Sequence, residues 1–166
     1  TDVAGGLTLN DGNTAAGKSL TIDATTMVST ALTLDASLEL DGSVIVNGGG
    51  VADTITGSAS TLGDTLNGNA GNDAFVFASA NLTLLDTIDG GAGTIDVIQI
   101  TDAATVVDAD FTNVTNVEKL LIDAAGTVIL DTLAVAAGIT TVANTTGAGA
   151  LNLTLKAGYT NDLTVA

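Results

Sequence analysis

Five short segments of the chain place an apolar residue two positions after an aspartate, and three of them follow glycine-rich turns. The segments begin at Asp53, Asp64, Asp73, Asp86 and Asp96, at uneven intervals. The glycine-rich turns read GGGVAD at 48–53, GNAGND at 68–73 and GGAGTID at 90–96, whereas GSASTLGD at 57–64 is looser. Glycine lets the backbone adopt left-handed conformations that turn carbonyl oxygens inward, and each aspartate adds a carboxylate.

Such turns are suited to binding a hard cation. One turn alone cannot surround an ion, but two turns stacked on the same edge can supply about 6–8 oxygens at roughly 2.3–2.6 Å, which is the calcium shell. The chain has no His and no Cys, which disfavours zinc, iron and copper. We therefore expect Ca²⁺ to join neighbouring turns. The expected ligand set comprises the five aspartates and Gly48, Gly50, Gly68, Asn69, Gly71, Asp89, Gly91 and Gly93.

The charge balance excludes several classes of function. The sequence contains 17 Asp and 2 Glu against 3 Lys, with no Arg, and its formal net charge is −16. Three isolated lysines cannot neutralise a row of phosphates, so we expect no nucleic-acid partner. No apolar run approaches the ~20 residues of a membrane helix, and anionic lipids would repel the chain, so we expect no membrane insertion. Catalytic triads need a base such as His, and we predict that the protein is not an enzyme.

Apolar residues alternate with polar ones along much of the chain, which is the spacing of strands. In the first region, 1–47, alternating units lie at 7–10, 20–23, 32–35, 38–41 and 44–47. The first three units start at nearly equal intervals, as successive rungs of a solenoid would. The last region, 101–166, contains candidate strands at 119–123, 127–130, 139–142 and 151–155. Short helical turns are predicted within 108–118 and 131–137, and we assign Asp108, Asp110 and Asp131 to the solvated surface.

The fold class predicted from this pattern is all-β, a parallel β-solenoid or β-roll with calcium-binding turns. A β-sandwich flanking a short β-roll is the alternative. Three regions are expected: a strand repeat region at 1–47, a calcium-binding β-roll at 48–100, and a strand repeat region at 101–166 that continues the solenoid. Without calcium, repulsion among the stacked aspartates should loosen residues 48–100.

The segment GNAGNDAFV at 68–76 resembles the RTX nonapeptide repeat, Gly-Gly-x-Gly-x-Asp-x-apolar-x, with Asn69 in place of the second glycine. The segment 48–56 matches with Val51 in place of the third glycine, and the repeat from Gly90 has one inserted residue. The resemblance implies a parallel β-roll in which alternate turns share an edge. Asp53 would then lie beside Asp73, and Asp64 would face the turn of Asp86 or Asp96.

Longer stretches are similar to segments of bacterial S-layer proteins and large RTX adhesins. They read DTIDGGAGTIDVIQI, FTNVTNVEKLLIDA and AVAAGITTV. This resemblance implies an extracellular or cell-surface protein, exported by type I secretion, that serves as a segment of an S-layer, matrix filament or adhesin stalk. The implied partners are further copies in an end-to-end or lattice homo-oligomer or polymer, with a cell-surface polysaccharide as another candidate. The alternatives are an adhesive module that binds ice or glycans and a secretion-signal region of a larger RTX enzyme.

Overall fold

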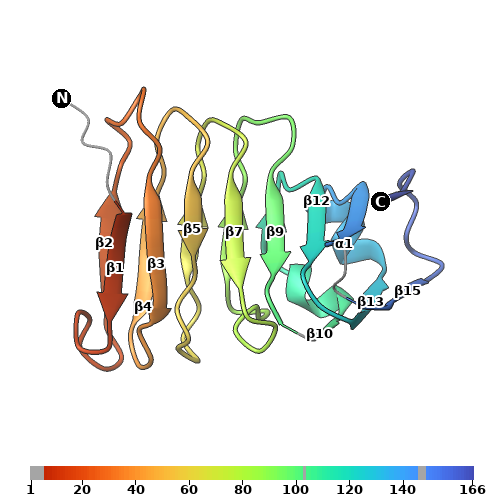
Figure 1. Ribbon diagram of the computed structural model, residues 1–166, viewed down its shortest axis with the longest axis horizontal. Helices are drawn as coiled ribbons and strands as arrows, with labels where there is room; N and C mark the ends of the chain where they lie inside the picture. The colour runs from red at the N-terminus through yellow and green to blue at the C-terminus, as the bar shows by residue number, and fades with distance from the viewer. Residues whose placement is uncertain (1–5, 103, 146–148) are drawn as a thin grey trace.

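The computed structural model describes residues 6–102, 104–145 and 149–166, so residues 1–5 of the first predicted region lie outside it. The chain is a parallel β-solenoid of about six turns (Figure 1). In the largest sheet, successive strands are separated along the chain by one strand of another sheet, or in one place by two, so one turn of the solenoid uses about two of the predicted strand units. Every strand pair among the described residues is parallel, which confirms the predicted β-solenoid and excludes a sandwich of hairpins.

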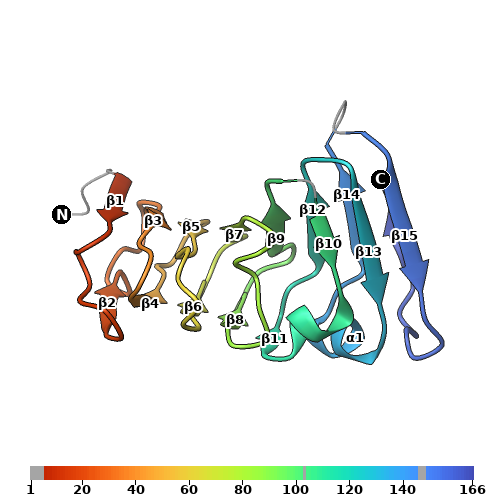
Figure 2. The same ribbon diagram turned by 90° about the horizontal axis from the view of Figure 1, so that it is seen from below.

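Three parallel sheets line the solenoid. The eight-stranded sheet has the order β1 (Gly6–Asn10), β3 (Thr33–Leu38), β5 (Thr54–Thr56), β7 (Ala74–Phe77), β9 (Val97–Ile100), β12 (Lys119–Ile122), β14 (Thr141–Asn144) and β16 (Thr164–Val165). The five-stranded sheet has the order β11 (Val114–Thr115), β8 (Thr87–Asp89), β6 (Thr65–Asn67), β4 (Ser43–Asn47) and β2 (Ser19–Asp23). The three-stranded sheet contains β10 (Ala104–Val106), β13 (Gly126–Leu130) and β15 (Leu151–Leu155). Seen from below, the solenoid is narrow up to β9 and broadens where the three-stranded sheet begins (Figure 2).

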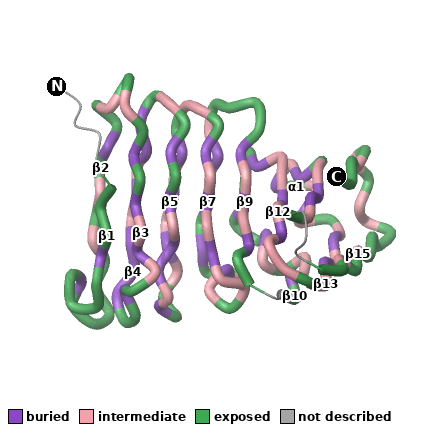
Figure 3. The backbone as a smooth tube through the Cα atoms, viewed as in Figure 1, coloured by how far each residue is buried: buried purple, intermediate pink, exposed green. Residues whose placement is uncertain are grey.

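The core consists of aliphatic and aromatic side chains stacked in register between the sheets. Alternation along each strand sends every second residue inward, and the parallel register places these residues above one another. The inward row of the eight-stranded sheet contains Leu34, Ile55, Phe75, Ile98, Leu120 and Val142. The facing row of the five-stranded sheet contains Val46, Leu66, Ile88 and Val114. In Figure 3, buried residues alternate with less buried ones along β3, β5, β7 and β9, as this stacking requires.

The unit at 38–41 does not form the predicted strand. Strand β3 ends at Leu38, and the next residues form a turn. Leu38 and Leu40 are exposed there, whereas Glu39 is fully buried. The alternation is inverted because the Glu39 carboxylate accepts backbone N–H groups from Thr14 and Gly42, which makes its burial favourable.

A short helix occupies one turn edge near the three-stranded sheet. Helix α1 (Thr132–Ala137) lies within the predicted segment and ends at Gly138, whose φ of 103° is left-handed. Its N-terminus is capped by Asp108, which stands in the 3₁₀-helix η1 (Asp108–Phe111) one turn earlier. The Asp108 carboxylate accepts the backbone N–H groups of Asp131, Leu133 and Ala134 at 2.8, 3.1 and 2.9 Å. The assignment of Asp108 to the solvated surface is therefore wrong.

Replacing Asp108 with Ala is expected to destabilise the fold by about 1–2 kcal/mol, because the helix loses the acceptor for its first N–H groups. Chemical denaturation followed by circular dichroism measures this cost. The calcium stoichiometry should not change, since the cap lies outside the glycine-rich turns. A variant as stable as the parent would show that the cap contributes nothing.

Candidate metal centre

The five predicted aspartates form two columns, one on each turn edge of the β-roll. Asp53, Asp73 and Asp96 precede strands of the eight-stranded sheet, and Asp64 and Asp86 precede strands of the five-stranded sheet. The Asp53 N–H donates to Asp73 Oδ1 at 2.7 Å, and the Asp73 N–H donates to Asp96 Oδ1 at 2.7 Å. On the other edge the Asp64 N–H donates to Asp86 Oδ1 at 2.9 Å. Asp53 thus lies beside Asp73, and Asp64 lies beside Asp86 rather than Asp96.

The first column, which we call the aspartate ladder, ends in a residue that the repeat pattern does not include. The Asp96 N–H donates to Glu118 Oε2 at 2.9 Å, so Glu118 continues the ladder formed by Asp53, Asp73 and Asp96. The sequence contains one indication that Glu118 belongs to this ladder. Glu118 stands two positions before the buried Leu120, as an aspartate of the repeat would.

Three of the five aspartates have both carboxylate oxygens hydrogen-bonded. In Asp53, Asp64 and Asp86, Oδ1 accepts a backbone N–H from one turn earlier. Their Oδ2 atoms each accept a backbone N–H from their own turn at 2.7 Å, and the donors are Gly49, Ser58 and Thr83. These carboxylates stabilise the turns without an ion.

Asp89 is held through one of its carboxylate oxygens. Its Oδ1 accepts the Gly91 N–H at 3.0 Å and the Asn116 amide at 2.8 Å. Asp89 stands at the end of β8, in register with Asn67 of β6, and the amide of Asn67 in turn donates to Asn47 of β4. The structure therefore places Asp89 in a ladder of polar residues beside the aspartate ladder.

Asp73 and Asp96 differ from the other aspartates because each keeps one buried oxygen without a partner. Both side chains are about 1% exposed. Among the described residues, the buried side-chain polar atoms that make no hydrogen bond are Asp73 Oδ2, Asp96 Oδ2 and the hydroxyl oxygen of Thr14. Burying an unpaired carboxylate oxygen is costly, so these two atoms favour a bound cation or a proton.

Glycines leave the space that these free oxygens face. A methyl group added at Gly68 would collide with Asp73 Oδ2 and would lie 2.6 Å from the carbonyl oxygen of Gly90. A methyl group at Gly93 would lie 2.6 Å from Asp96 Oδ2 and would collide with the carbonyl oxygen of Gly71. Each free carboxylate oxygen thus borders the space beside a glycine, and a carbonyl oxygen of a neighbouring turn borders the same space. Such a donor set, made only of oxygens, suits a hard cation.

The turn at 68–73 keeps its backbone shape although Asn69 stands in place of the second glycine of the repeat. Asn69 has a φ of 68°, in the left-handed region, which asparagine tolerates better than most residues. Gly71 also has a positive φ, 133°. The Asn69 amide donates to the carbonyl oxygen of Gly48 one turn earlier at 2.7 Å, which ties the two turns together. The substitution of asparagine for glycine therefore preserves the turn.

An open hollow of about 590 Å³ lies over the turns 68–73 and 90–96. It is lined by Gly71, Asn72, Ala92, Gly93 and Thr94. The hollow borders Gly93, whereas the free oxygens of Asp73 and Asp96 are themselves buried.

Burial raises the pKa of the two incompletely paired aspartates. The pKa of Asp73 rises to about 6 because its carboxylate is desolvated; the Asp53 N–H opposes this rise, and the charges of Asp53 and Asp96 add to it. The pKa of Asp96 is also raised, first by burial and then by the charges of Glu118 and Asp89. A cation at these oxygens would remove the repulsion that these shifts reflect.

The raised pKa of Asp73 predicts that mild acid stabilises the chain when calcium is absent. Its folded pKa of about 6 lies above the ordinary 3.8, so the folded chain binds this proton more tightly than the unfolded chain does. Stability should therefore rise as the pH falls through 6 toward 3.8. The lowered pKa values of Asp23, Asp35 and Glu39 act oppositely, but only below about 4.5, the ordinary value of Glu39.

Thermal unfolding in EGTA between pH 7.5 and 5 measures this effect. A midpoint that falls steadily over that range would contradict the prediction.

Comparisons of the chain with models of protein families, with curated proteins and with solved structures give no match. The RTX resemblance therefore stays a prediction, and the assignment of an ion depends on the geometry of the turns. Among the residues that the structure describes, no helix has the length and hydropathy to span a membrane.

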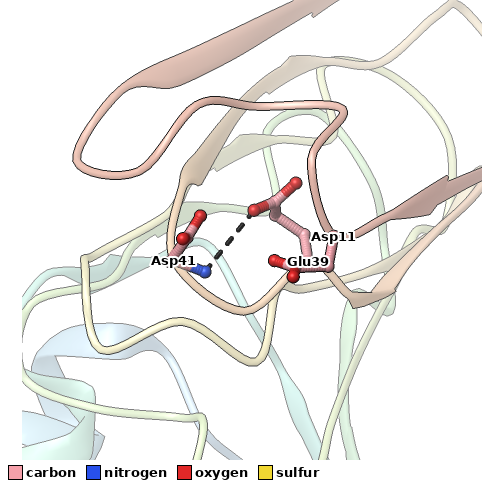
Figure 4. Close-up of side chains that lie close together, drawn as sticks. All are labelled: Asp11, Glu39 and Asp41. Carbon is pink, nitrogen blue, oxygen red and sulfur yellow. Dashed lines mark hydrogen bonds between the residues drawn. The ribbon is translucent and has the colours of Figure 1, made fainter.

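A second group of carboxylates lies near the start of the solenoid. Asp11, Glu39 and Asp41 each place a carboxylate oxygen within 4.8 Å of the others, so they could hold a metal ion (Figure 4). Asp11 and Asp41 are exposed and Glu39 is buried. Sequence reasoning missed this group because Asp11 lies one turn of the solenoid away from Glu39 and Asp41, and all three lie outside the glycine-rich repeats.

Proposed function

We propose that the chain is an extracellular structural segment whose glycine-rich turns are joined by calcium. The observation that carries this proposal is the pair of buried, unpartnered oxygens, Asp73 Oδ2 and Asp96 Oδ2. Each adjoins a carbonyl oxygen of a neighbouring turn, in space that only glycine leaves open. Calcium accepts such mixed carboxylate and carbonyl shells, whereas Mg²⁺ demands a tighter octahedral one.

The proposed ion acts as a crosslink between the turns at 68–73 and 90–96. Asp73 and Asp96 supply the charged ligands, and the carbonyl groups of Gly71 and Gly90 supply neutral ones. Asp53 and the second column already stabilise their turns through backbone N–H groups. We therefore infer that calcium stiffens a solenoid whose other turns are held by hydrogen bonds.

A structural role agrees with the chemistry of the chain. The sequence has no His, Arg or Cys, which are the usual bases, anion-binding groups and nucleophiles of enzymes. Repeated parallel turns give an elongated body whose length follows the number of repeats. We propose that this body is part of an S-layer, matrix filament or adhesin stalk, exported by type I secretion and assembled as a homopolymer.

The adhesive alternative gains no support from the outward side chains. A flat ice-binding or glycan-binding face needs the same residue type in each turn. On the five-stranded sheet, Thr21 is in register with Ile45, which is in register with Thr65 and then Thr87. The threonine row is interrupted in the second turn, so this face lacks the regular repeat that the adhesive function needs.

Electron microscopy with and without EGTA tests the structural proposal. Calcium should promote filaments or sheets and sharpen the β-type circular dichroism spectrum, and the chelator should reverse both. A spectrum and morphology that are unaffected by the chelator would exclude calcium-dependent assembly.

A further inference from the structure

We propose that Asp11, Glu39 and Asp41, together with the hydroxyl of Thr14, form a second calcium site that clamps the segment 11–18 to the turn 39–43. This site lies outside the glycine-rich turns. It does not depend on the proposed binding of calcium at Asp73 and Asp96, and either site can be correct without the other.

The three carboxylates converge from two segments that lie one turn of the solenoid apart. Asp11 follows β1, whereas Glu39 and Asp41 lie in the turn between β3 and β4. Backbone hydrogen bonds hold the segments together: the Gly17 N–H donates to the Asp41 carbonyl at 2.8 Å, and the Ser43 N–H donates to the Lys18 carbonyl at 2.9 Å. Figure 4 shows the three side chains gathered between these segments.

Thr14 provides an observation that is independent of the acidic cluster. Its side chain is only 4% exposed, and its hydroxyl oxygen makes no hydrogen bond. A methyl group added at Gly42 would lie 2.5 Å from Thr14 Cβ and 3.2 Å from Glu39 Oε1, so Thr14 packs directly beside the Glu39 carboxylate. The hydroxyl contributes to lowering the pKa of that carboxylate, although it makes no hydrogen bond by distance and angle. It is therefore a buried oxygen beside the Glu39 carboxylate that is available as a neutral ligand.

Glu39 is held in the charged form that a cation requires. Burial alone would raise its pKa, but the backbone N–H groups of Gly42, Thr14 and Asp41 outweigh this effect, and the pKa lies below its ordinary value. These N–H groups also fix the position of the carboxylate, at 3.0 Å for Gly42 and 3.1 Å for Thr14. Asp11 and Asp41 are exposed, so a bound ion would keep some of its water, which calcium tolerates.

A clamp at this position would act on a segment with little burial. Every residue from 11 to 18 is exposed except Thr14, so few apolar contacts hold this segment against the next turn. Segments with so little burial open at low cost in free energy. An ion shared between Asp11 and Asp41 would raise that cost and order the segment.

Calorimetric titration with CaCl₂ separates this site from the glycine-rich turns. The titrated proteins are the full chain and its Asp73→Asn/Asp96→Asn variant, at constant ionic strength with Mg²⁺ as competitor. We expect the variant to keep one binding event. Adding Asp11→Asn or Asp41→Asn should weaken that event at least about tenfold, because each removes a charged ligand. Asp162→Asn is the matched control, since it removes one charge elsewhere on the chain and should change nothing.

Two further measurements distinguish the loss of a calcium ligand from the misfolding of a variant. Thr14→Val keeps the shape of the side chain but removes its hydroxyl, and it should also weaken the event. Hydrogen exchange should show that calcium protects 11–18 in the parent and in Asp73→Asn/Asp96→Asn, but not in Asp41→Asn.

The outcomes separate the two sites. The clamp is wrong if Asp73→Asn/Asp96→Asn binds no calcium, or if its binding is insensitive to Asp11→Asn and Asp41→Asn. The opposite result is also possible: the parent and Asp73→Asn/Asp96→Asn give the same calcium isotherm, and Asp41→Asn weakens the binding. That result would support the clamp and would exclude calcium binding at the glycine-rich turns.

Discussion

Replacing Asp73 with Asn is expected to stabilise the metal-free chain and, at the same time, to weaken calcium binding at the turns 68–73 and 90–96. The side-chain oxygen of the new asparagine can still accept the Asp53 N–H, while its amide takes the place of the free oxygen. That amide can donate to the carbonyl oxygen of Gly90, which the carboxylate can only repel. The gain should be about 1 kcal/mol at neutral pH, the usual net value of a hydrogen bond. When calcium is present, the same amide directs an N–H donor at the ion in place of a carboxylate oxygen, so the affinity for calcium falls.

Replacing Asp53 with Asn is the matched control. Both oxygens of Asp53 accept backbone N–H groups, from Leu32 at 2.6 Å and from Gly49 at 2.7 Å. An asparagine at position 53 would place its amide N–H donors against one of these two backbone N–H donors. This should cost about 1–3 kcal/mol of stability with or without calcium. Urea denaturation of both variants, in EGTA and in calcium, measures these effects. Equal destabilisation of the two variants in EGTA would mean that Asp73 is an ordinary turn cap.

Calcium is expected to raise the thermal unfolding midpoint of the chain by roughly 5–10 °C. An ion present at about 100 times its dissociation constant stabilises the folded state by about 2.7 kcal/mol. For a domain of this length, each kcal/mol shifts the midpoint by about 2–4 °C. The effect should be large here because the ion also removes repulsion between buried carboxylates such as Asp73 and Asp96.

Differential scanning calorimetry in EGTA, in calcium and in magnesium measures the shift. Hydrogen exchange should show added protection in the turns at 68–73 and 90–96, besides the protection of 11–18 that the second proposed site predicts. An equal shift with magnesium, or protection spread evenly along the chain, would count against a specific calcium crosslink.

The parallel solenoid was predictable because the residue types that mark its strands and turns recur along the sequence. Alternating apolar residues, such as those at 20–23 and 44–47, indicate strands, and each aspartate placed two positions before an apolar residue marks where a turn ends. The edge shared by Asp53 and Asp73 followed from the resemblance to the nonapeptide repeat. The segment at 38–41 was read wrongly because strand alternation cannot distinguish an exposed leucine from a buried one.

The hydrogen bonds of each carboxylate were not predictable from the repeat. Asp53 and Asp73 occupy equivalent positions, yet a single N–H, that of Gly49, satisfies the second oxygen of Asp53 and has no counterpart at Asp73. That difference depends on the path of the turn backbone. The roles of Asp108 and Glu39 were likewise hidden, because Asp108 caps a helix one solenoid turn later and Glu39 accepts an N–H from one turn earlier.

A crystal structure grown in calcium, with an anomalous difference map, tests the central claim most directly. Calcium bound between the turns at 68–73 and 90–96 predicts a peak within about 2.3–2.6 Å of Asp73 Oδ2 or Asp96 Oδ2, with carbonyl oxygens of these turns in the same shell. A map without a peak at either oxygen, in crystals that contain calcium elsewhere, would contradict the account.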